Sequence, residues 1–461
     1  MNPPTKFICI VLLAALCVVA ANAQRNKPVQ APNIVILLAD DLGYGDLGSY
    51  GHARIRTPYL DRLAQQGLRL TSYYAAAPVC SPSRAGLLTG RIPQRDGIGD
   101  WIQEGSSVFL PRGTATLASE LQRAGYATAM MGKWHLNGKM DGSQPTPGDH
   151  GFQYWFATQN NALPTHENPV NFIRNGQAIG PSQGYSSTLI ADEAIAWLKQ
   201  RKADQPFFLY VPFHAPHERI ATASTFFLEY RDVKNADEAQ YYGNVAQLDY
   251  EIGRILQMLE ELKLSPNTFV LFASDNGPET LNRYKEATRS YGSPGAVNGQ
   301  TLRGMKLHLY EGGIRVPAIV RWPTVIKAGR ISDAPVSGMD WLPTLRALAG
   351  STTPELKVDG EDITSLLRSD KFARQRPIYW QYDAAINTKS DKLLPKFALR
   401  EGDYKLLVTG DFSNIELYNL KTDPAETTEI SKRELARVKA MAERVKLTYN
   451  QIQALKHAPK N

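Results

Sequence analysis

Two pairs of neighbouring residues carry side-chain oxygen atoms, and each pair closely follows a run of apolar residues. Asp40 and Asp41 follow the run 33–39, and Asp275 and Asn276 follow the run 268–273. Neighbouring carboxylates repel each other unless a cation holds them, and oxygen ligands suit Ca²⁺ or Mg²⁺ better than zinc. Turn or capping chemistry is the alternative for each pair alone. Their shared position behind apolar runs favours one metal site.

In two places a lysine is followed two residues later by a histidine. Lys133 and His135 face the same side of an extended segment, and Lys306 and His308 repeat this spacing. Each of these residues alone is more typical of a solvated surface. Arg84 adds a fixed positive charge near the start of a short helix predicted from residues 83–89, and a helix N-terminus favours anions. Around a divalent cation, the set predicts a site for an ester of a tetrahedral oxyanion.

The cysteine content raises a separate question. The chain has three cysteines, of which Cys9 and Cys17 lie in a predicted export signal, so the mature chain keeps only Cys80. A single thiol in an oxidising compartment is buried, reactive or chemically converted. The cysteine count alone favours burial, because free cysteine behaves as a small hydrophobic residue.

The export signal is predicted at residues 1–23. Lys6 precedes the apolar run 7–20, and Ala21, Asn22 and Ala23 form an A-x-A cleavage site. The run is short for a membrane span, which makes a retained anchor the weaker alternative. We expect an exported protein, periplasmic or secreted, with no membrane attachment after cleavage.

The elements that must position these residues alternate along the chain. The apolar runs indicate strands that are buried on both faces of a mostly parallel sheet, with helices between them. The expected strands are 33–39, 127–131, 207–213 and 268–273, and the expected helices are 58–66, 116–124, 187–200 and 238–262. This alternation predicts an α/β fold with the site at the carboxyl ends of the strands.

The composition changes near residues 367–377, a charged and polar stretch. Beyond it the pattern predicts a small antiparallel sheet and a basic amphipathic helix, an α+β subdomain. The expected strands are 378–382, 397–400, 404–408 and 416–418, and the expected helix is 431–455. We therefore divide the mature chain into a catalytic α/β domain, residues 24–375, and a C-terminal unit, residues 376–461.

Overall composition narrows the class of protein. The 461 residues are 43% hydrophobic and 21% charged, which excludes a collagen, a coiled coil and a wholly disordered chain. A net charge of +7 suits an acidic substrate. The excess is too diffuse to indicate a nucleic-acid partner.

Several motifs together resemble the type I sulfatases. The most specific is Cys-x-Pro-Ser-Arg, residues 80–84, which continues in the family pattern to Arg91. A second family signature is similar to residues 132–136, although Asn137 stands where many members have glycine. Residues 40–46 and 311–317 are also similar to family segments, and the likeness runs in order from Pro32 to Asp423. The resemblance implies an alkaline-phosphatase-like sandwich.

The resemblance also implies the chemistry. A formylglycine-generating maturation enzyme would oxidise Cys80 to formylglycine (3-oxoalanine), whose hydrate is the nucleophile. One hydroxyl would attack sulfur and the other would expel sulfate, so that one hard step becomes two easier ones. This conversion accounts for the lone cysteine better than burial does.

Carried over by position, the resemblance assigns the remaining roles. One Ca²⁺ would polarise a sulfate oxygen. Its ligands would be Asp40, Asp41, Asp275 and Asn276, with converted Cys80 beside it. Arg84 and Lys133 would hold the hydrated aldehyde, and His135 would be the base for sulfate elimination. His214 and Lys306 would grip the sulfate, and one of them would protonate the leaving oxygen. His217 is an ambiguous neighbour of His214, and His308 is left outside the catalytic set.

The expected substrate is a sulfated carbohydrate containing galactose or N-acetylgalactosamine, by general likeness to glycan sulfatases. Small aryl sulfates are an alternative substrate, and a phosphatase or phosphodiesterase of the same superfold and a non-catalytic binder of sulfated glycans are alternative functions. The loop residues Trp101, Asn160, Asn161 and His166 could line a sugar pocket, although most such loop residues only cover surface. Gly312 and Gly313 are expected in a turn with positive φ.

Overall fold

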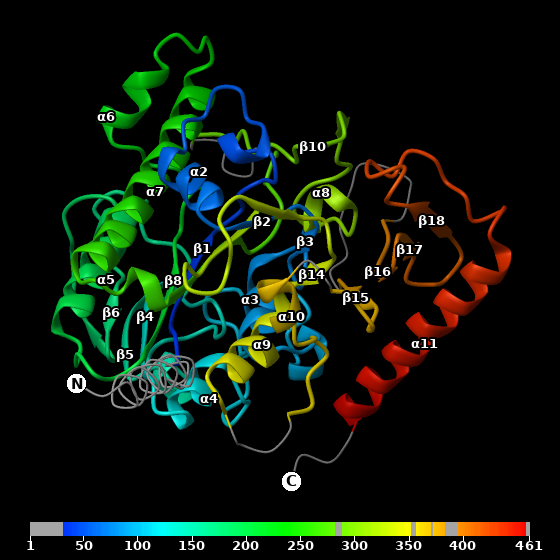
Figure 1. Ribbon diagram of the computed structural model, residues 1–461, viewed down its shortest axis with the longest axis horizontal. Helices are drawn as coiled ribbons and strands as arrows, with labels where there is room; N and C mark the ends of the chain where they lie inside the picture. Colours follow the sequence, from blue (N-terminus) through cyan, green and yellow to red (C-terminus); the bar gives the residue numbers. More distant parts are fainter. Residues whose placement is uncertain (1–30, 282–287, 352–355, 370–371, 383–393, 458–461) are drawn as a thin grey trace, which may run out of the picture.

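A ten-stranded mixed sheet forms the centre of the protein in the computed structural model, which describes residues 31–281, 288–351, 356–369, 372–382 and 394–457 (Figure 1). In sheet order its strands are β13 (Arg330–Ser332), β2 (Leu68–Leu70), β12 (Ala318–Arg321), β9 (Thr268–Ser274), β1 (Asn33–Ala39), β8 (Phe207–Pro212), β4 (Ala127–Lys133), β5 (Tyr154–Thr158), β6 (Ile173–Arg174) and β7 (Gln177–Ala178). The predicted export signal, residues 1–23, lies outside the described residues. Among the helices of the described ranges, none is long and apolar enough to cross a membrane.

The middle of the sheet is parallel, as predicted. Strands β9, β1, β8, β4 and β5 run in one direction, and β12 pairs antiparallel with β9. The four apolar runs of the sequence are four of these five central strands. The register pairs Ala39 with Ser274 and Leu38 with Pro212. The carboxyl ends of β1, β8 and β9 therefore lie at one level, and the residues that follow them meet at one edge.

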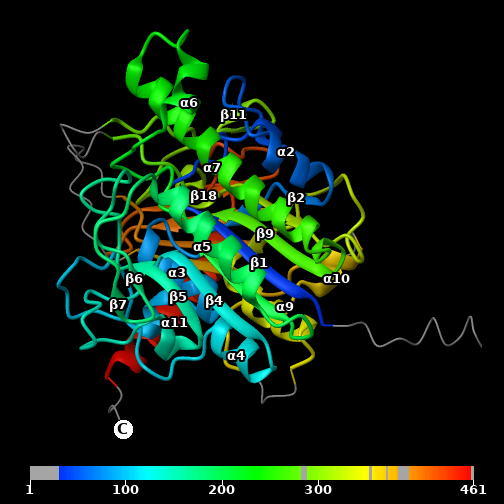
Figure 2. The same ribbon diagram turned by 90° about the vertical axis from the view of Figure 1, so that its left-hand side faces the viewer.

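Helices cover both faces of the sheet. Along β1, Val35 and Leu37 join one hydrophobic cluster, whereas Ile34 and Ile36 join the other, because successive side chains of a strand point to opposite faces. The first face is covered by α2 (Pro58–Gln65), α5 (Ser186–Gln200) and α7 (Ala236–Glu261), and the second by α3 (Cys80–Thr89), α4 (Leu117–Arg123), α9 (Trp341–Leu348) and α10 (Thr364–Arg368). Figure 2 views the molecule with α5 and α7 in front of the strands. These layers make the predicted α/β sandwich.

Short elements complete the connections. They are β3 (Tyr73–Tyr74), which pairs with β14 (Val336–Ser337), the hairpin of β10 (Ala296–Val297) and β11 (Gln300–Thr301), the helices α6 (Ser224–Phe227) and α8 (Glu311–Ile314), and the 3₁₀ turns at Gly48–Tyr50, Pro93–Asp96, Pro147–His150, Leu228–Tyr230, Ser265–Asn267 and Gly338–Asp340.

The C-terminal part forms the small antiparallel sheet that the sequence predicts. Its strands are β15 (Ile378–Gln381), β16 (Phe397–Glu401), β17 (Tyr404–Val408) and β18 (Ile415–Asn419), followed by α11 (Leu435–His457). Met441 and Val445 of α11 are buried in one hydrophobic cluster with Leu406 of β17. Figure 1 shows this unit at the right, with α11 at its outer edge.

Buried charges join this sheet to the rest of the protein. The Lys405 Nζ of β17 lies 2.9 Å from Glu311 Oε1 and 2.9 Å from Glu426 Oε1. Glu311 also accepts a hydrogen bond of 2.7 Å from the Tyr74 hydroxyl, which Arg400 of β16 contacts in turn. Burial would raise the pKa of Glu311, but Lys405 and Arg315 hold it at about 2. A buried pair of this kind is costly to break on one side only.

The expectation for Gly312 and Gly313 is wrong. Both glycines lie in the short helix α8, and neither is among the residues with positive φ. Glycine is required there by close packing: a Cβ on Gly312 would collide with the carbonyl oxygen of Gly304, and one on Gly313 with that of His308. These contacts draw the segment with Lys306 tightly against α8.

Candidate active site

The two predicted pairs of oxygen ligands meet where β1 and β9 end. The Asp40 amide donates to Ala215 O over 3.1 Å, and the Asp275 amide donates to Ala39 O over 3.1 Å, which continues the ladder beyond both strands. Asp41 has a φ of 64°, so the chain turns sharply away there, and its amide donates to Asp275 Oδ1 over 3.2 Å. Asp residues tolerate this left-handed conformation better than most. The turn holds the side chains of both pairs at one place.

Cys80 is the first residue of α3, whose residues are all buried. The free N–H groups and the dipole of the first turn favour negative charge beside it. Arg84 follows one turn later on the same face, and it has no exposed surface. The helix begins three residues earlier than the predicted range 83–89, so Cys80 lies within its first turn.

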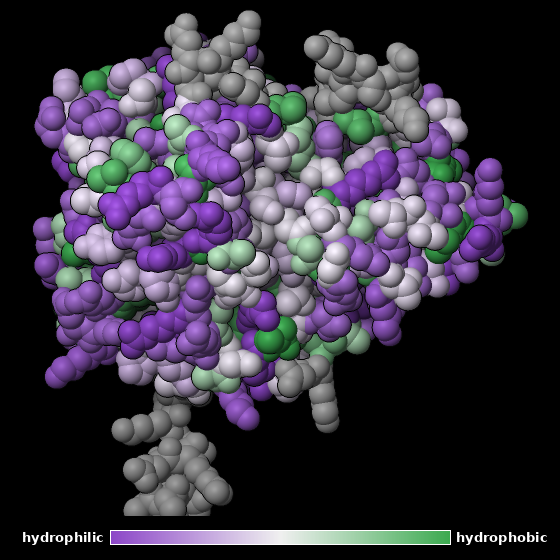
Figure 3. All heavy atoms as spheres, turned by 90° about the horizontal axis from the view of Figure 1, so that it is seen from above, coloured by the Kyte–Doolittle hydropathy of each residue, from purple (hydrophilic) through white to green (hydrophobic). Residues whose placement is uncertain are grey.

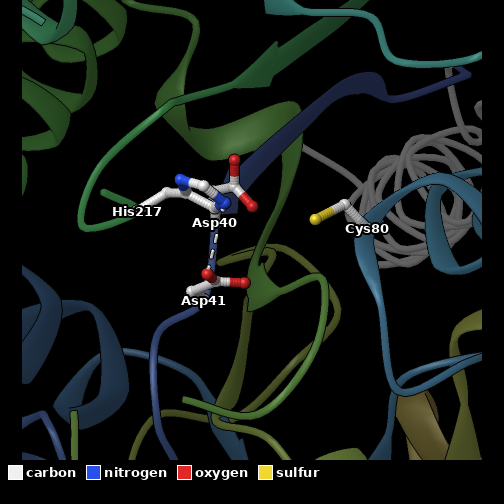
Figure 4. Close-up of side chains that lie close together, drawn as sticks. All are labelled: Asp40, Asp41, Cys80 and His217. Atoms are coloured by element: carbon white, nitrogen blue, oxygen red, sulfur yellow. Dashed lines mark ion pairs between the residues drawn. The ribbon is translucent and has the colours of Figure 1, made fainter. Parts of the chain in front are cut away.

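Four ligand atoms form a compact cluster (Figure 4). One atom each from Asp40, Asp41, Cys80 and His217 lies within 4.8 Å of the others. In Figure 4 the sulfur of Cys80 points towards the two carboxylates, and the dashed line joins His217 to Asp41. The distance from His217 Nε2 to Asp41 Oδ2 is 3.5 Å. Acidic, nucleophilic and imidazole groups from three distant segments thus share one centre.

Three cations surround the carboxylates. Lys133 Nζ lies 2.7 Å from Asp40 Oδ2, and Lys306 Nζ lies 2.6 Å from Asp41 Oδ2. Arg84 donates through Nε to Asp275 Oδ2 over 2.9 Å, and its Nη2 lies 2.8 Å from the same oxygen. Burial would raise the pKa of Asp40, but Lys133 and Arg84 hold it well below its usual range. Each of the three carboxyl groups therefore has a cationic partner.

The donor set fits a hard cation. Asp40 Oδ1 and Asn276 Oδ1 are buried oxygens that lack a hydrogen-bond partner among the described residues, and such atoms are rare unless something unseen binds them. Carboxylate and amide oxygens are the ligands of Ca²⁺ and Mg²⁺. Asp40, Asp41, Asp275 and Asn276 would hold the ion.

Unmodified Cys80 is a poor nucleophile in this setting. Burial raises the pKa of its thiol to about 12, although Lys133 and Lys306 act in the opposite direction. The thiolate, rather than the thiol, is the reactive form of cysteine. The protonated thiol would therefore be inert at neutral pH, in spite of the cations around it.

His135 is held in one tautomer. Its Nε2 lies 3.1 Å from Ile102 O, and a carbonyl oxygen can only accept, so Nε2 carries the proton. Nδ1 is buried, and no described residue bonds it. Burial lowers the pKa of His135 well below its usual value, and Lys133 and Arg84 lower it further. His135 is thus a neutral imidazole with a bare Nδ1, as a general base requires.

This environment predicts the acid side of the pH–rate profile. Because a lowered pKa keeps His135 unprotonated below its ordinary value of 6.5, we expect the acid limb of kcat/KM to lie below pH 6.5. The measurement is the catalytic rate against pH, with H135N, which cannot act as a base, losing most of the rate. An acid limb at or above pH 6.5 that belongs to His135 would contradict the assignment.

His214 and His217 occupy different surroundings. His214 lies outside the four-residue cluster: its Nε2 is 2.7 Å from Thr158 Oγ1, and its ring packs against His166. His217 lies inside the cluster. Its Nδ1 contacts the carbonyl oxygen of Glu218 and its Nε2 lies 3.5 Å from Asp41 Oδ2, so both ring nitrogens face oxygen atoms. The sequence left the choice between the two histidines open, and the structure places His217, rather than His214, in the cluster.

Two further residues touch the site that the sequence did not assign to catalysis. Asn161 Oδ1 accepts a hydrogen bond of 3.3 Å from Lys133 Nζ, and the Ile102 amide donates to Ser81 Oγ over 3.0 Å. Asn161 stood only among loop residues that could line a sugar pocket. Nothing in the residue type of Ile102 could reveal its role, because it acts through its backbone. His308 packs its ring near Tyr310.

Comparisons with known protein families give two matches. A model described as Sulfatase matches residues 32–351, and a model described as N-sulphoglucosamine sulphohydrolase, C-terminal, matches residues 305–454. The first covers more than half of the chain and includes every residue of the site.

Individual proteins are also similar. The N-acetylgalactosamine-6-sulfatase of Canis lupus familiaris is 34% identical over 376 residues, which cover 76% of this chain and 68% of that protein. The steryl-sulfatase of Homo sapiens is 32% identical over 440 residues, 78% of this chain and 73% of that protein. Among solved structures, Ps i-CgsB in complex with k-i-k-neocarrahexaose has a TM-score of 0.80 at 26% identity, and the match covers 94% of this chain and 98% of that one.

Proposed function

From the premise that this chain belongs to the type I sulfatase family, has its alkaline-phosphatase-like fold and is a sulfuric ester hydrolase, we propose that it releases sulfate from a sulfated carbohydrate. The observation that carries the proposal is the convergence of Arg84, Lys133 and Lys306 around Cys80 and the strand-end carboxylates. Three buried cations offer more positive charge than the protein's own carboxylates need once a divalent cation binds. A sulfate ester group, which carries a negative charge shared over three oxygens, fits that charge.

Two additions to the chain complete the proposed site. A bound Ca²⁺ would supply Lewis-acid polarisation of a sulfate oxygen, and conversion of Cys80 to formylglycine by a maturation enzyme would supply a hydroxyl nucleophile. The inert thiol supports the conversion, since cysteine itself offers no nucleophile there. The two unpartnered oxygens, Asp40 Oδ1 and Asn276 Oδ1, support the metal.

We assign the remaining catalytic roles to side chains of this protein. Arg84 and Lys133 hold the side chain of residue 80 and offset charge that develops beside it. His135 Nδ1 accepts the proton whose removal releases sulfate. Burial would lower the pKa of Lys306, but Asp41 holds it well above its usual range, so its ammonium can donate to a sulfate oxygen. His217 lies beside Lys306 and directs Nε2 at the same place. We assign the contact with the ester oxygen to this pair, with His214 as the alternative partner.

The substrate class rests on likeness and charge. One similar protein is an N-acetylgalactosamine-6-sulfatase, and the similar structure Ps i-CgsB holds a neocarrahexaose. The net charge of +7 suits a polyanionic chain. We propose that the substrate is a sulfated polysaccharide of the galactose or N-acetylgalactosamine type, or its oligosaccharides. We also propose that the enzyme is exported, with a catalytic domain at residues 24–375 and a C-terminal unit at residues 376–461.

A substrate panel tests this function. Sulfate release is measured from sulfated galactose and N-acetylgalactosamine oligosaccharides, a steroid sulfate and an aryl sulfate, with matched phosphate esters as controls. We expect kcat/KM for at least one sulfated oligosaccharide to exceed that for the aryl and steroid sulfates by about tenfold or more. A preference for the steroid or aryl ester would contradict the carbohydrate assignment, and a preference for phosphate would contradict the reaction.

Removal of the metal gives a second expectation. Chelation should lower sulfate release by at least about 100-fold, because no divalent cation would then polarise the ester. The melting temperature should fall as well, since an ion that binds only the folded state stabilises it. Added Ca²⁺ should restore both quantities, and D40N should respond to neither treatment. Full activity after exhaustive chelation would exclude a metal-dependent site.

A further inference from the structure

The segment Asp100 to Ile102 lies directly against the reactive centre. The Ile102 amide donates to the hydroxyl of Ser81, which is the neighbour of Cys80, and the Ile102 carbonyl accepts from the His135 ring. Ile102 itself is buried. Two hydrogen bonds therefore fix this segment to the residue after Cys80 and to His135. Trp101 directly precedes the residue that makes both contacts.

A second contact braces the segment from the C-terminal sheet. The Tyr382 hydroxyl, just beyond β15, donates to Asp100 Oδ1 over 3.0 Å, and the amide of Trp101 donates to the same oxygen over 2.7 Å. Burial raises the pKa of Tyr382, and the charges of Asp100, Lys306 and Cys80 also act on it. Tyr382 thus lies within electrostatic range of the site. Residues from both parts of the chain position Trp101.

Trp101 is exposed although it stands beside a buried centre. Its exposed fraction is 46%, and the exposed large hydrophobic side chains of the described ranges include no other tryptophan. Figure 3 shows a surface that is mostly hydrophilic with separate hydrophobic patches. An indole left in water costs free energy that a ligand could recover. A rigid backbone beneath it keeps the entropic cost of such binding low.

We propose that Trp101 is the sugar-binding platform of the active site: its indole packs against the apolar face of a pyranose ring whose sulfate reaches residue 80. A pyranose carries C–H groups on one face and hydroxyls at its edge, so an aromatic side chain suits the face. The Tyr382–Asp100 brace makes Tyr382 a positioning residue for this platform. The assignment rests on the proposed carbohydrate substrate and adds the residue that selects it.

The test compares W101A, W101F and wild type with the preferred sulfated oligosaccharide. W101A should raise KM about tenfold or more with kcat changed less than about threefold, and W101F should recover most of the loss, because stacking needs an aromatic ring. Inhibition by inorganic sulfate, which reaches only the anion site, should stay unchanged. Y250A is the matched control: Tyr250 is 43% exposed and packs with Tyr59 and Phe226 on the helical face. It should leave KM unchanged.

Each outcome separates the two proposals. An unchanged KM in W101A, with wild type active on the oligosaccharide, would overturn the platform alone. Equal loss of oligosaccharide and sulfate binding would also overturn it, since it would show a structural role. Binding of the oligosaccharide to C80A is measured directly by calorimetry. If wild type releases no sulfate from sugars, the carbohydrate function fails. The platform then stands if W101A in the C80A background weakens binding about tenfold, and falls if it does not.

The role of Tyr382 has its own test. In active protein, Y382F should raise KM by a smaller factor than W101A does, with unchanged inhibition by sulfate. An unchanged KM in Y382F would remove Tyr382 from the proposal.

Discussion

Replacement of Cys80 by alanine should lower sulfate release by about 10⁴-fold or more while the protein stays folded. The loss follows because no other side chain in the cluster can serve as a nucleophile: the neighbours Asp40 and Lys133 pair with each other at 2.7 Å. The fold should survive because the removed sulfur belongs to a large apolar cluster and makes no salt bridge. Steady-state kinetics and a thermal melt measure the two quantities.

The serine variant separates the nucleophile from the site around it. C80S places a hydroxyl at the same position but cannot be oxidised to the aldehyde, so it should turn over no faster than C80A and should retain sulfate covalently. Intact-protein mass spectrometry detects the bound sulfate, and the peptide of residues 70–84 from wild-type protein reports the conversion of Cys80. Multiple turnover by C80S at wild-type rate would contradict the formylglycine proposal.

The second large effect should follow from the exchange of Arg84 for lysine. Arg84 reaches Asp275 through two nitrogens at 2.9 and 2.8 Å and also donates to Lys133 O at 2.8 Å, all without exposure to solvent. Lysine keeps the charge but cannot reproduce this planar pattern of donors. Because Asp275 would lose the two hydrogen bonds from Arg84 in a buried site, R84K should lower the free energy of unfolding by about 3 kcal/mol. Sulfate release should fall by at least about 100-fold.

A matched exchange elsewhere isolates burial as the cause. Arg54 pairs with Asp232 at 2.5 Å, but their side chains are 46% and 69% exposed. R54K should therefore change the free energy of unfolding by less than about 1 kcal/mol and leave kcat/KM unaltered. Denaturant titration of both variants measures the contrast. Similar effects of R84K and R54K would show that the buried geometry of Arg84 is unimportant.

The sequence carried enough information to predict four of the five central parallel strands. The central strands are mostly apolar along their whole length because helices cover both faces, so runs such as 207–213 stand out without alternation. The C-terminal hairpins could also be predicted from the sequence, since turns such as Glu401-Gly402-Asp403 separate short apolar strands. The short edge strands β6, β7 and β13 were not predicted. Two or three residues carry too little pattern to distinguish a strand from a loop.

The sequence predicts only part of the candidate site, because some of its side chains are oriented by tertiary packing. Asp40 and Asp275 follow strands directly, so the register of the sheet brings them together. His214 and His217 follow β8 in a turn, and no pattern of residue types says which ring faces the cluster. The left-handed φ of 59° at His135 and its bond to Ile102 depend on tertiary packing. The prediction of a positive φ for the two glycines of α8 was wrong, because close packing rather than backbone conformation requires glycine there.

The burial of Cys80 sets an order of events during synthesis. In the folded chain Cys80 is 2% exposed and belongs to a cluster with Trp380, Leu407 and Val445, which are added hundreds of residues after it. A second protein cannot reach a side chain so enclosed. The conversion that we propose for Cys80 would therefore have to precede closure of the C-terminal sheet, and the interval between translation of Cys80 and translation of α11 would be its time window. A variant that folds faster would leave more of its population permanently unconverted.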